Sequence, residues 1–132
     1  MASGQSTEPG DRAVSWAVTV STRYAGRTAI LDFQGRFTLG PAVNEIETRV
    51  AAALTAKSAT GLVLNFAAVS AIDSAGVGEL MKVRTMTMQR GVRMALADAN
   101  PKVIEVLKIT RLNGLLKVCP DEASALQHVA KP

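Results

Sequence analysis

Two short apolar segments, Gly61–Phe66 (GLVLNF) and Val92–Ala97 (VRMALA), most constrain how this chain can fold. Each has the length and the apolar character of a strand that is buried inside a sheet. A helix-length amphipathic segment, Ser74–Arg90, separates them, and Gly91 is a natural end for that helix. Strands that are joined through a helix are expected to be parallel, with a right-handed crossover. The pattern therefore predicts an α/β architecture.

The segments on either side extend this pattern. Val14–Tyr24 alternates apolar and polar residues, and a turn at Ala25-Gly26 connects it to the apolar segment Thr28–Phe33, so the two predict an antiparallel hairpin. The other expected elements are a helix at Pro41–Lys57, a connecting loop at Ala67–Asp73, a helix at Pro101–Thr110, a turn at Asn113-Gly114, a strand at Leu115–Val118 and a helix at Asp121–Val129. We expect a mixed, mainly parallel sheet of four to five strands, an N-terminal antiparallel hairpin and about four helices.

The length of 132 residues is that of one domain. The first residues, Met1–Asp11, are small and polar and include proline and glycine, which predicts a disordered tail over residues 1–12. One domain is expected over residues 13–130. No apolar run approaches the ~20 residues of a membrane span, so we expect a cytoplasmic protein without one.

Residue counts argue against several classes of function. Cys119 is the only cysteine and His128 the only histidine. One cysteine excludes an intrachain disulfide, and the two counts together remove most zinc sites, His–Cys dyads and Ser–His–Asp triads. The net charge is only +4 and aromatic residues make up 4%, which argues against nucleic-acid binding. Glu79 and Asp98 are interpreted as solvated charges. We therefore expect no enzyme activity, no cofactor and no metal.

The segment Ser70–Glu79 (SAIDSAGVGE) carries the most chemical information. Asp73 and Ser74 stand at the start of the predicted helix, where free backbone N–H groups favour a hydrogen-bond acceptor or an anion. The plain interpretation is that one of them caps the helix. Gly76 and Gly78 each cost up to ~1 kcal/mol relative to alanine in a helix. They either leave room for a partner to approach the backbone or allow the helix to pack tightly on the sheet.

Helical spacing also predicts which side of this helix faces the core. Val77, Leu80, Met81 and Met88 fall on one side, together with the stem of Arg84. Met86 is expected on the exposed side.

The sequence Ile72-Asp-Ser-Ala-Gly-Val77, preceded by the strand Leu62–Phe66, resembles the signature of the STAS domain of anti-sigma factor antagonists. The resemblance spans about Ser15–Val129. It includes Asp32-Phe-Gln-Gly35 before the first helix. It also includes Val103–Leu116, which is similar to the family's apolar helix followed by Leu-x-Gly-Leu.

The resemblance implies a specific function. In that family the serine at the position of Ser74 is phosphorylated by an anti-sigma factor that is a serine kinase. The unphosphorylated antagonist binds the kinase and frees a sigma factor, the phosphorylated one is released, and a serine phosphatase restores it. Ser74 is then the phosphorylation site, and the implied partner-binding residues are Thr38, Asp73, Ser74, Ala75, Gly76 and Val77.

Two positions depart from the family pattern. Thr38 stands where the family often has an acidic residue near the nucleotide of the kinase, and Ala75 stands where a second serine is common. Ala75 leaves Ser74 as the single hydroxyl at this point. Other members with the same fold are non-phosphorylated subunits of lipid-transporter ATPase complexes or scaffolds of stress-sensing assemblies, and the sequence leaves these alternatives open.

Overall fold

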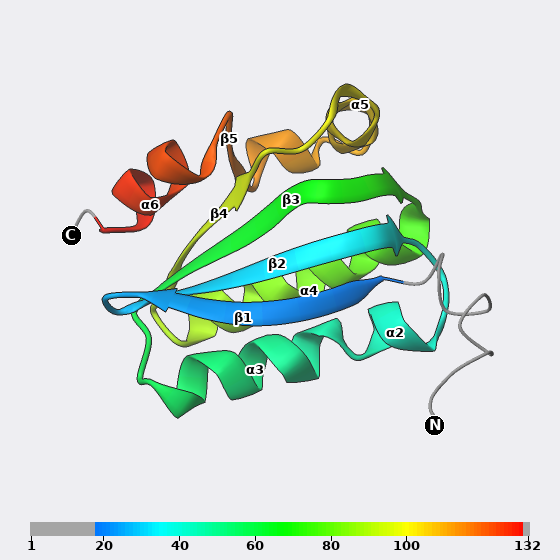
Figure 1. The fold of residues 1–132 in the computed structure, drawn as a ribbon. Helices are drawn as coiled ribbons and strands as arrows, with labels where there is room; N and C mark the ends of the chain where they lie inside the picture. Colours follow the sequence, from blue (N-terminus) through cyan, green and yellow to red (C-terminus); the bar gives the residue numbers. More distant parts are fainter. Residues whose placement is uncertain (1–17, 131–132) are drawn as a thin grey trace.

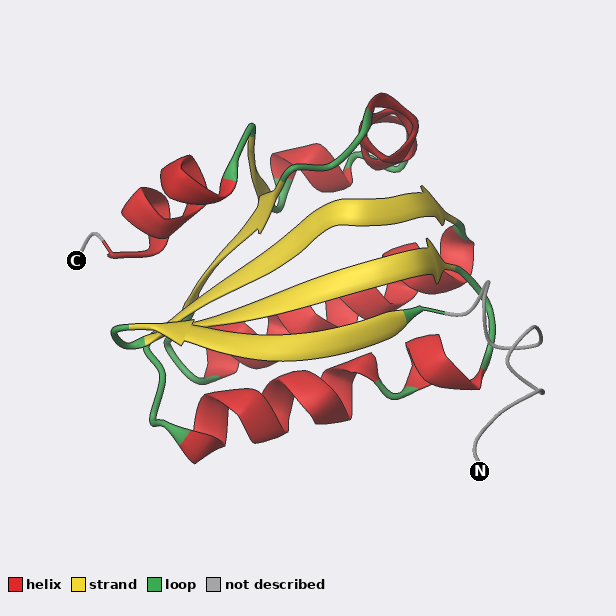
Figure 2. Cartoon of the chain, in the orientation of Figure 1, coloured by secondary structure: helices red, strands yellow, loops and turns green. Residues whose placement is uncertain are grey.

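The computed structural model describes residues 18–130, which form a five-stranded sheet with helices on both of its faces (Figures 1 and 2). In chain order the elements are β1 (Thr19–Ala25), β2 (Thr28–Phe37), α2 (Pro41–Asn44), α3 (Ile46–Ala56), β3 (Gly61–Ile72), α4 (Ser74–Gln89), β4 (Arg93–Ala97), α5 (Pro101–Ile109), the 3₁₀ helix η1 (Leu112–Gly114), β5 (Lys117–Cys119) and α6 (Glu122–Ala130). The expected tail, the start of the domain at residue 13 and residues 14–17 of the first expected strand lie outside the described residues.

The strands lie in the order β1-β2-β3-β4-β5. The pairing of β1 with β2 is antiparallel and the other pairings are parallel, which confirms the mixed, mainly parallel sheet and its N-terminal hairpin. Figure 1 shows α2, α3 and α4 on one side of the sheet and α6 on the other. Consequently the carboxyl ends of β2 and β3 and the start of α4 meet at one edge of the sheet.

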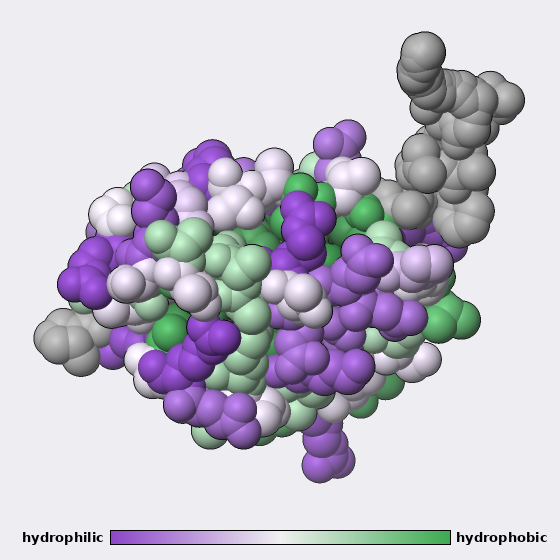
Figure 3. All heavy atoms as spheres, turned by 90° about the horizontal axis from the view of Figure 1, so that it is seen from below, coloured by the Kyte–Doolittle hydropathy of each residue, from purple (hydrophilic) through white to green (hydrophobic). Residues whose placement is uncertain are grey.

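The main core lies between the sheet and the helices α3 and α4. Phe33, Phe37 and Phe66 are at most 1% exposed, and their rings meet edge to face with centroids 5.4, 5.5 and 5.1 Å apart. Such ring pairs add ~0.5–1.5 kcal/mol to the burial of each ring. On the outside of this layer, the surface mixes hydrophilic and hydrophobic side chains (Figure 3). The buried residues of α3, Ile46, Val50, Ala53 and Leu54, face the core beneath this surface.

The strand β3 is longer than expected. Residues Ala67–Ile72, predicted to be part of a loop, continue the strand and pair with the last residues of β2. The register shifts twice along this part of the pairing, between Asp32 and Gln34 and between Gly35 and Arg36. These irregularities break the alternation of apolar residues, which is the signal that would have predicted a strand.

The helix expected at Pro41–Lys57 is two helices. The short α2 ends at Asn44, and α3 begins at Ile46 after Glu45, which adopts helical angles but forms no side-chain cap. Val43 and Ile46 are at most 2% exposed, so both helices are fixed to the same core. The apolar spacing runs unbroken across the junction, and for that reason it gave no sign of the break.

Candidate functional site

The candidate site lies where the loop after β2 meets the start of α4 (Figure 1). Asp73 has extended backbone angles and is the N-cap of α4, because its Oδ1 accepts a hydrogen bond from the backbone N–H of Gly76 at 3.0 Å. This is the usual geometry of an aspartate cap. Ser74 is the first residue of the helix and is exposed. The capping role therefore belongs to Asp73, and the hydroxyl-bearing side chain beside it faces solvent.

The second carboxylate oxygen of Asp73 holds the neighbouring loop. Its Oδ2 accepts a hydrogen bond from the backbone N–H of Leu39 at 2.9 Å, across 34 positions of the chain. Partial burial acts to raise the pKa of Asp73, but the hydrogen bonds from Leu39 and Gly76 outweigh it, so the pKa lies below its usual range. The carboxylate is thus held in its charged form, one residue from the hydroxyl of Ser74.

The remaining expected partner-binding residues lie around this carboxylate. Thr38 is half-buried and directly precedes Leu39 in the loop that Asp73 holds. Ala75 and Val77 are half-buried on the first turns of α4 and pack against the core. The structure thus brings two separate stretches of sequence together at one edge.

The two glycines of this helix have different environments. A Cβ at Gly76 would overlap the carbonyl oxygen of Phe37, so this glycine permits tight packing of α4 against the end of β2. A Cβ at Gly78 would meet nothing within 4 Å. The packing interpretation therefore holds for Gly76, whereas Gly78 leaves bare backbone on the exposed side of α4.

The predicted core side of α4 is displaced by about one residue, although Leu80 is buried as expected. The residues that face the sheet include Gly76, Leu80, Val83 and Thr87, whereas the expected face was one residue further along the chain, a rotation of about 100°. Met86 is buried, and Met88, expected in the core, is 61% exposed. The close approach of Gly76 to β2 fixes this rotation.

Sequence reasoning missed two residues near the site. Leu39 is a large apolar side chain that is 72% exposed in the loop beside Ser74. Glu79, interpreted as a solvated charge, is only 2% exposed and lies between α4 and α3. Its position four residues before Val83 and seven before Met86 places it on the buried side, and that spacing is the signal that would have identified it.

Within residues 18–130, no group of three or more His, Cys, Asp or Glu side chains is placed to hold a metal ion. No helix in that same stretch is both long and apolar enough to cross a membrane. His128 lies on α6, on the opposite face of the sheet from α4 (Figure 1). What the edge offers chemically is an exposed hydroxyl beside a fixed carboxylate at the N-terminus of a 16-residue helix.

Comparison with known families defines the class of this domain. The model of the STAS domain family matches residues 19–125, and the chain belongs to that family. A comparison with curated proteins gave no match.

Several solved structures share the fold. SpoIIAA, an anti-sigma factor antagonist, in its unphosphorylated form is 21% identical over 80% of this chain and 92% of its own, with a TM-score of 0.67. Bacillus SpoIIAA in its phosphorylated form is 20% identical over 80% and 96%, with a TM-score of 0.62. An anti-sigma factor antagonist from Mycobacterium paratuberculosis is 18% identical over 87% and 96%, with a TM-score of 0.71. These neighbours include antagonists in both phosphorylation states.

Proposed function

We propose that this protein is an anti-sigma factor antagonist that binds a serine-kinase anti-sigma factor and is switched off by phosphorylation of Ser74. The observation that carries the proposal is the exposed Ser74 hydroxyl at the first residue of α4, beside the carboxylate of Asp73. A kinase must bring the γ-phosphoryl group of ATP in line with the accepting oxygen, which requires such exposure. The protein is then the substrate of the kinase, which supplies ATP and Mg²⁺.

The family and its solved relatives support this function. The chain belongs to the STAS family, and SpoIIAA has been solved both with and without its phosphate. In this proposal the kinase contacts the first turn of α4 and the loop before α2, through Asp73, Ala75, Val77 and Thr38. Gly76 contributes by allowing that turn to pack close to β2. The protein acts in the cytoplasm, where its partners are.

Electrostatics gives a reason why the phosphate would release the partner. A phosphoserine adds about −1.5 to −2 charges at pH 7. The helix N-terminus stabilises an exposed anion by only ~0.3–1 kcal/mol. Burying the same dianion beside Asp73 in a protein interface costs several kcal/mol, and every ~1.4 kcal/mol is a tenfold loss of affinity. Phosphorylation therefore blocks binding without any change of fold, and a serine phosphatase reverses it.

Titration calorimetry with each anti-sigma-type serine kinase of the source genome tests the proposal. We expect the wild type and Ser74→Ala to bind one of these kinases with affinities within about threefold of each other, because the substitution removes no charge. Ser74→Asp adds one negative charge and is expected to bind at least about tenfold more weakly. A subunit of a transporter complex or a scaffold would bind no such kinase. Equal affinity of Ser74→Asp and wild type would overturn the switch.

A further inference from the structure

Glu79 is a buried carboxylate that has no part in the proposed phosphorylation of Ser74. It lies on α4, five residues after Ser74, and is 2% exposed. A buried carboxylate is costly unless hydrogen bonds compensate for the loss of water. Glu79 has one hydrogen-bond partner and one ion-pair partner. Its Oε2 accepts a hydrogen bond from the backbone N–H of Glu47 at 2.9 Å, and its Oε1 lies 3.5 Å from the Nζ of Lys82.

The hydrogen bond to Glu47 replaces a missing helix cap. Glu47 lies in the first turn of α3, where backbone N–H groups have no partner within the helix. The N-cap residue of α3, Glu45, forms no side-chain cap. Glu79 supplies the acceptor from the neighbouring helix, and its negative charge also suits the positive end of the α3 dipole.

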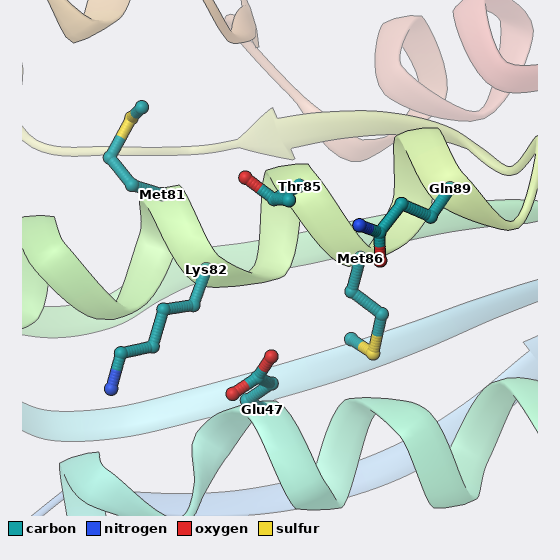
Figure 4. Close-up of a pocket in the computed structure, with 6 residues that line it drawn as sticks. All are labelled: Glu47, Met81, Lys82, Thr85, Met86 and Gln89. Carbon is teal, nitrogen blue, oxygen red and sulfur yellow. The ribbon is translucent and has the colours of Figure 1, made fainter.

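Figure 4 shows the surface groove that adjoins this contact, with Glu47 and Lys82 drawn as sticks. A groove of about 270 Å³ separates α3 from α4, and its lining residues include Glu47 on α3 and Lys82 on α4. The Lys82 side chain is 60% exposed, so solvent reaches the outer side of this contact while Glu79 stays covered. The groove therefore lies next to the Glu79–Glu47 tether, since its lining contains one partner of each Glu79 contact.

The N-cap carboxylate of α4 and a carboxylate within α4 thus hold the two ends of one segment. Asp73 binds the backbone N–H of Leu39, and Glu79 binds that of Glu47. The segment between them, residues 39–47, contains α2 and lies along the first turns of α4, with Val43 buried beneath it. Val43 and Ile46 hold the middle of the segment in the core, and the two carboxylates hold its ends against α4 beside Ser74.

We propose that Glu79 is a positioning residue for partner binding, which holds residues 39–47 in the place where the kinase meets them beside Ser74. The inference rests on the proposed function, because it assigns a role at the same surface. A partner that finds the segment already in place loses less conformational freedom on binding than one that must order it. Without the Glu79 anchor, the segment keeps its buried residues in the core but is held less tightly at its α3 end. The kinase then has to restrict this extra motion, so its affinity falls while the chemical step at Ser74 stays the same.

The first test is amide hydrogen exchange of the full chain. Glu79→Ala is expected to speed exchange of the Leu39 and Glu47 amides by at least about tenfold, although Leu39 itself bonds only to Asp73. Glu79→Gln keeps an oxygen acceptor and should stay within about threefold of the wild type. Glu105→Ala, which removes an exposed carboxylate from α5, is the matched control and should change neither amide.

The second test is phosphorylation of Ser74 by the kinase with Mg·ATP. Glu79→Ala should raise KM for the protein substrate about tenfold with kcat unchanged, and Glu79→Gln should restore it. Val129→Ala, which loosens the core on the opposite face of the sheet, controls for lost stability and should leave KM unchanged. An unchanged KM in Glu79→Ala, or an equal rise in Val129→Ala, overturns the inference. If the wild type accepts no phosphate, the proposed function fails. The role of Glu79 in holding the segment is still tested by hydrogen exchange, and an unchanged exchange rate of the Leu39 amide in Glu79→Ala would overturn it.

Discussion

The backbone N–H of Leu39 donates a hydrogen bond to Oδ2 of Asp73 at 2.9 Å and thereby joins the loop after β2 to the start of α4. The other oxygen of the same carboxylate caps α4 through Gly76. One side chain therefore fixes both the helix that carries Ser74 and the loop that lies beside it. Asp73 therefore sets the geometry of this edge.

Replacing Asp73 should separate its two roles. Asp73→Ala removes both hydrogen bonds and should lower the free energy of unfolding by about 1–2 kcal/mol, the upper range for loss of a helix cap. Asp73→Asn keeps one carbonyl oxygen that can cap the helix, so its free energy of unfolding should fall by less. Urea denaturation measures both values. Equal stability of Asp73→Ala and the wild type would show that the carboxylate fixes neither element.

The lowered pKa of Asp73 predicts how stability depends on pH. The folded state holds the carboxylate in its charged form. The contribution of Asp73 to the free energy of unfolding is therefore fully present above its unfolded pKa, near 3.9, and is lost as the pH falls through the lower pKa of the folded state. Denaturation midpoints measured from pH 6 down to about pH 2 should show this loss. The Asp73→Asn variant should show a shallower decline. An identical pH profile for the two proteins would contradict the assignment.

The glycines of α4 offer a matched pair of substitutions. Gly76→Ala places a Cβ against the carbonyl of Phe37 and should destabilise the fold by about 1–3 kcal/mol. Gly78→Ala meets open space and should stabilise the helix by up to ~1 kcal/mol. Thermal unfolding distinguishes the two. A shift of the unfolding midpoint in the same direction for both variants would contradict the close contact between Gly76 and the end of β2.

How far the sequence predicts this fold can be seen in particular elements. Gly61–Phe66 and Val92–Ala97 were identifiable as strands because apolar segments of that length require a buried place, and the second is observed as Arg93–Ala97. The end of β3 was not, because two register shifts interrupt its pattern. The positions of Asp73 and Ser74 at the start of α4 followed from capping preferences, which act locally.

The contacts of the site were not predictable in the same way. The bond from Leu39 to Asp73 and the bond from Glu47 to Glu79 each join residues more than 30 positions apart. Local periodicity contains no information on such pairs. A one-residue rotation of α4 was enough to turn Glu79 from an expected surface charge into a buried anchor.

An ion-pair network fixes the start of α6 to the opposite face of the sheet. Arg23 on β1 binds Asp32 on β2 at 2.8 Å and Glu122 on α6 at 2.6 Å, and Asn65 on β3 also donates to Glu122. Arg23, and to a lesser extent Asn65, lower the pKa of Glu122. Glu122→Gln should cost at most ~1 kcal/mol, since the network is partly exposed. The loss should shrink in 1 M salt, and a salt-independent loss would contradict an ionic cause.

The most direct test of the central claim is intact mass spectrometry after incubation with the serine kinase and Mg·ATP. We predict that the wild type gains about 80 Da, the mass of one phosphate, and that fragment ions place it on Ser74. Ser74→Ala should bind the kinase but gain no mass. Equal phosphate incorporation by Ser74→Ala and the wild type would show that Ser74 is not the acceptor and would contradict the proposed switch.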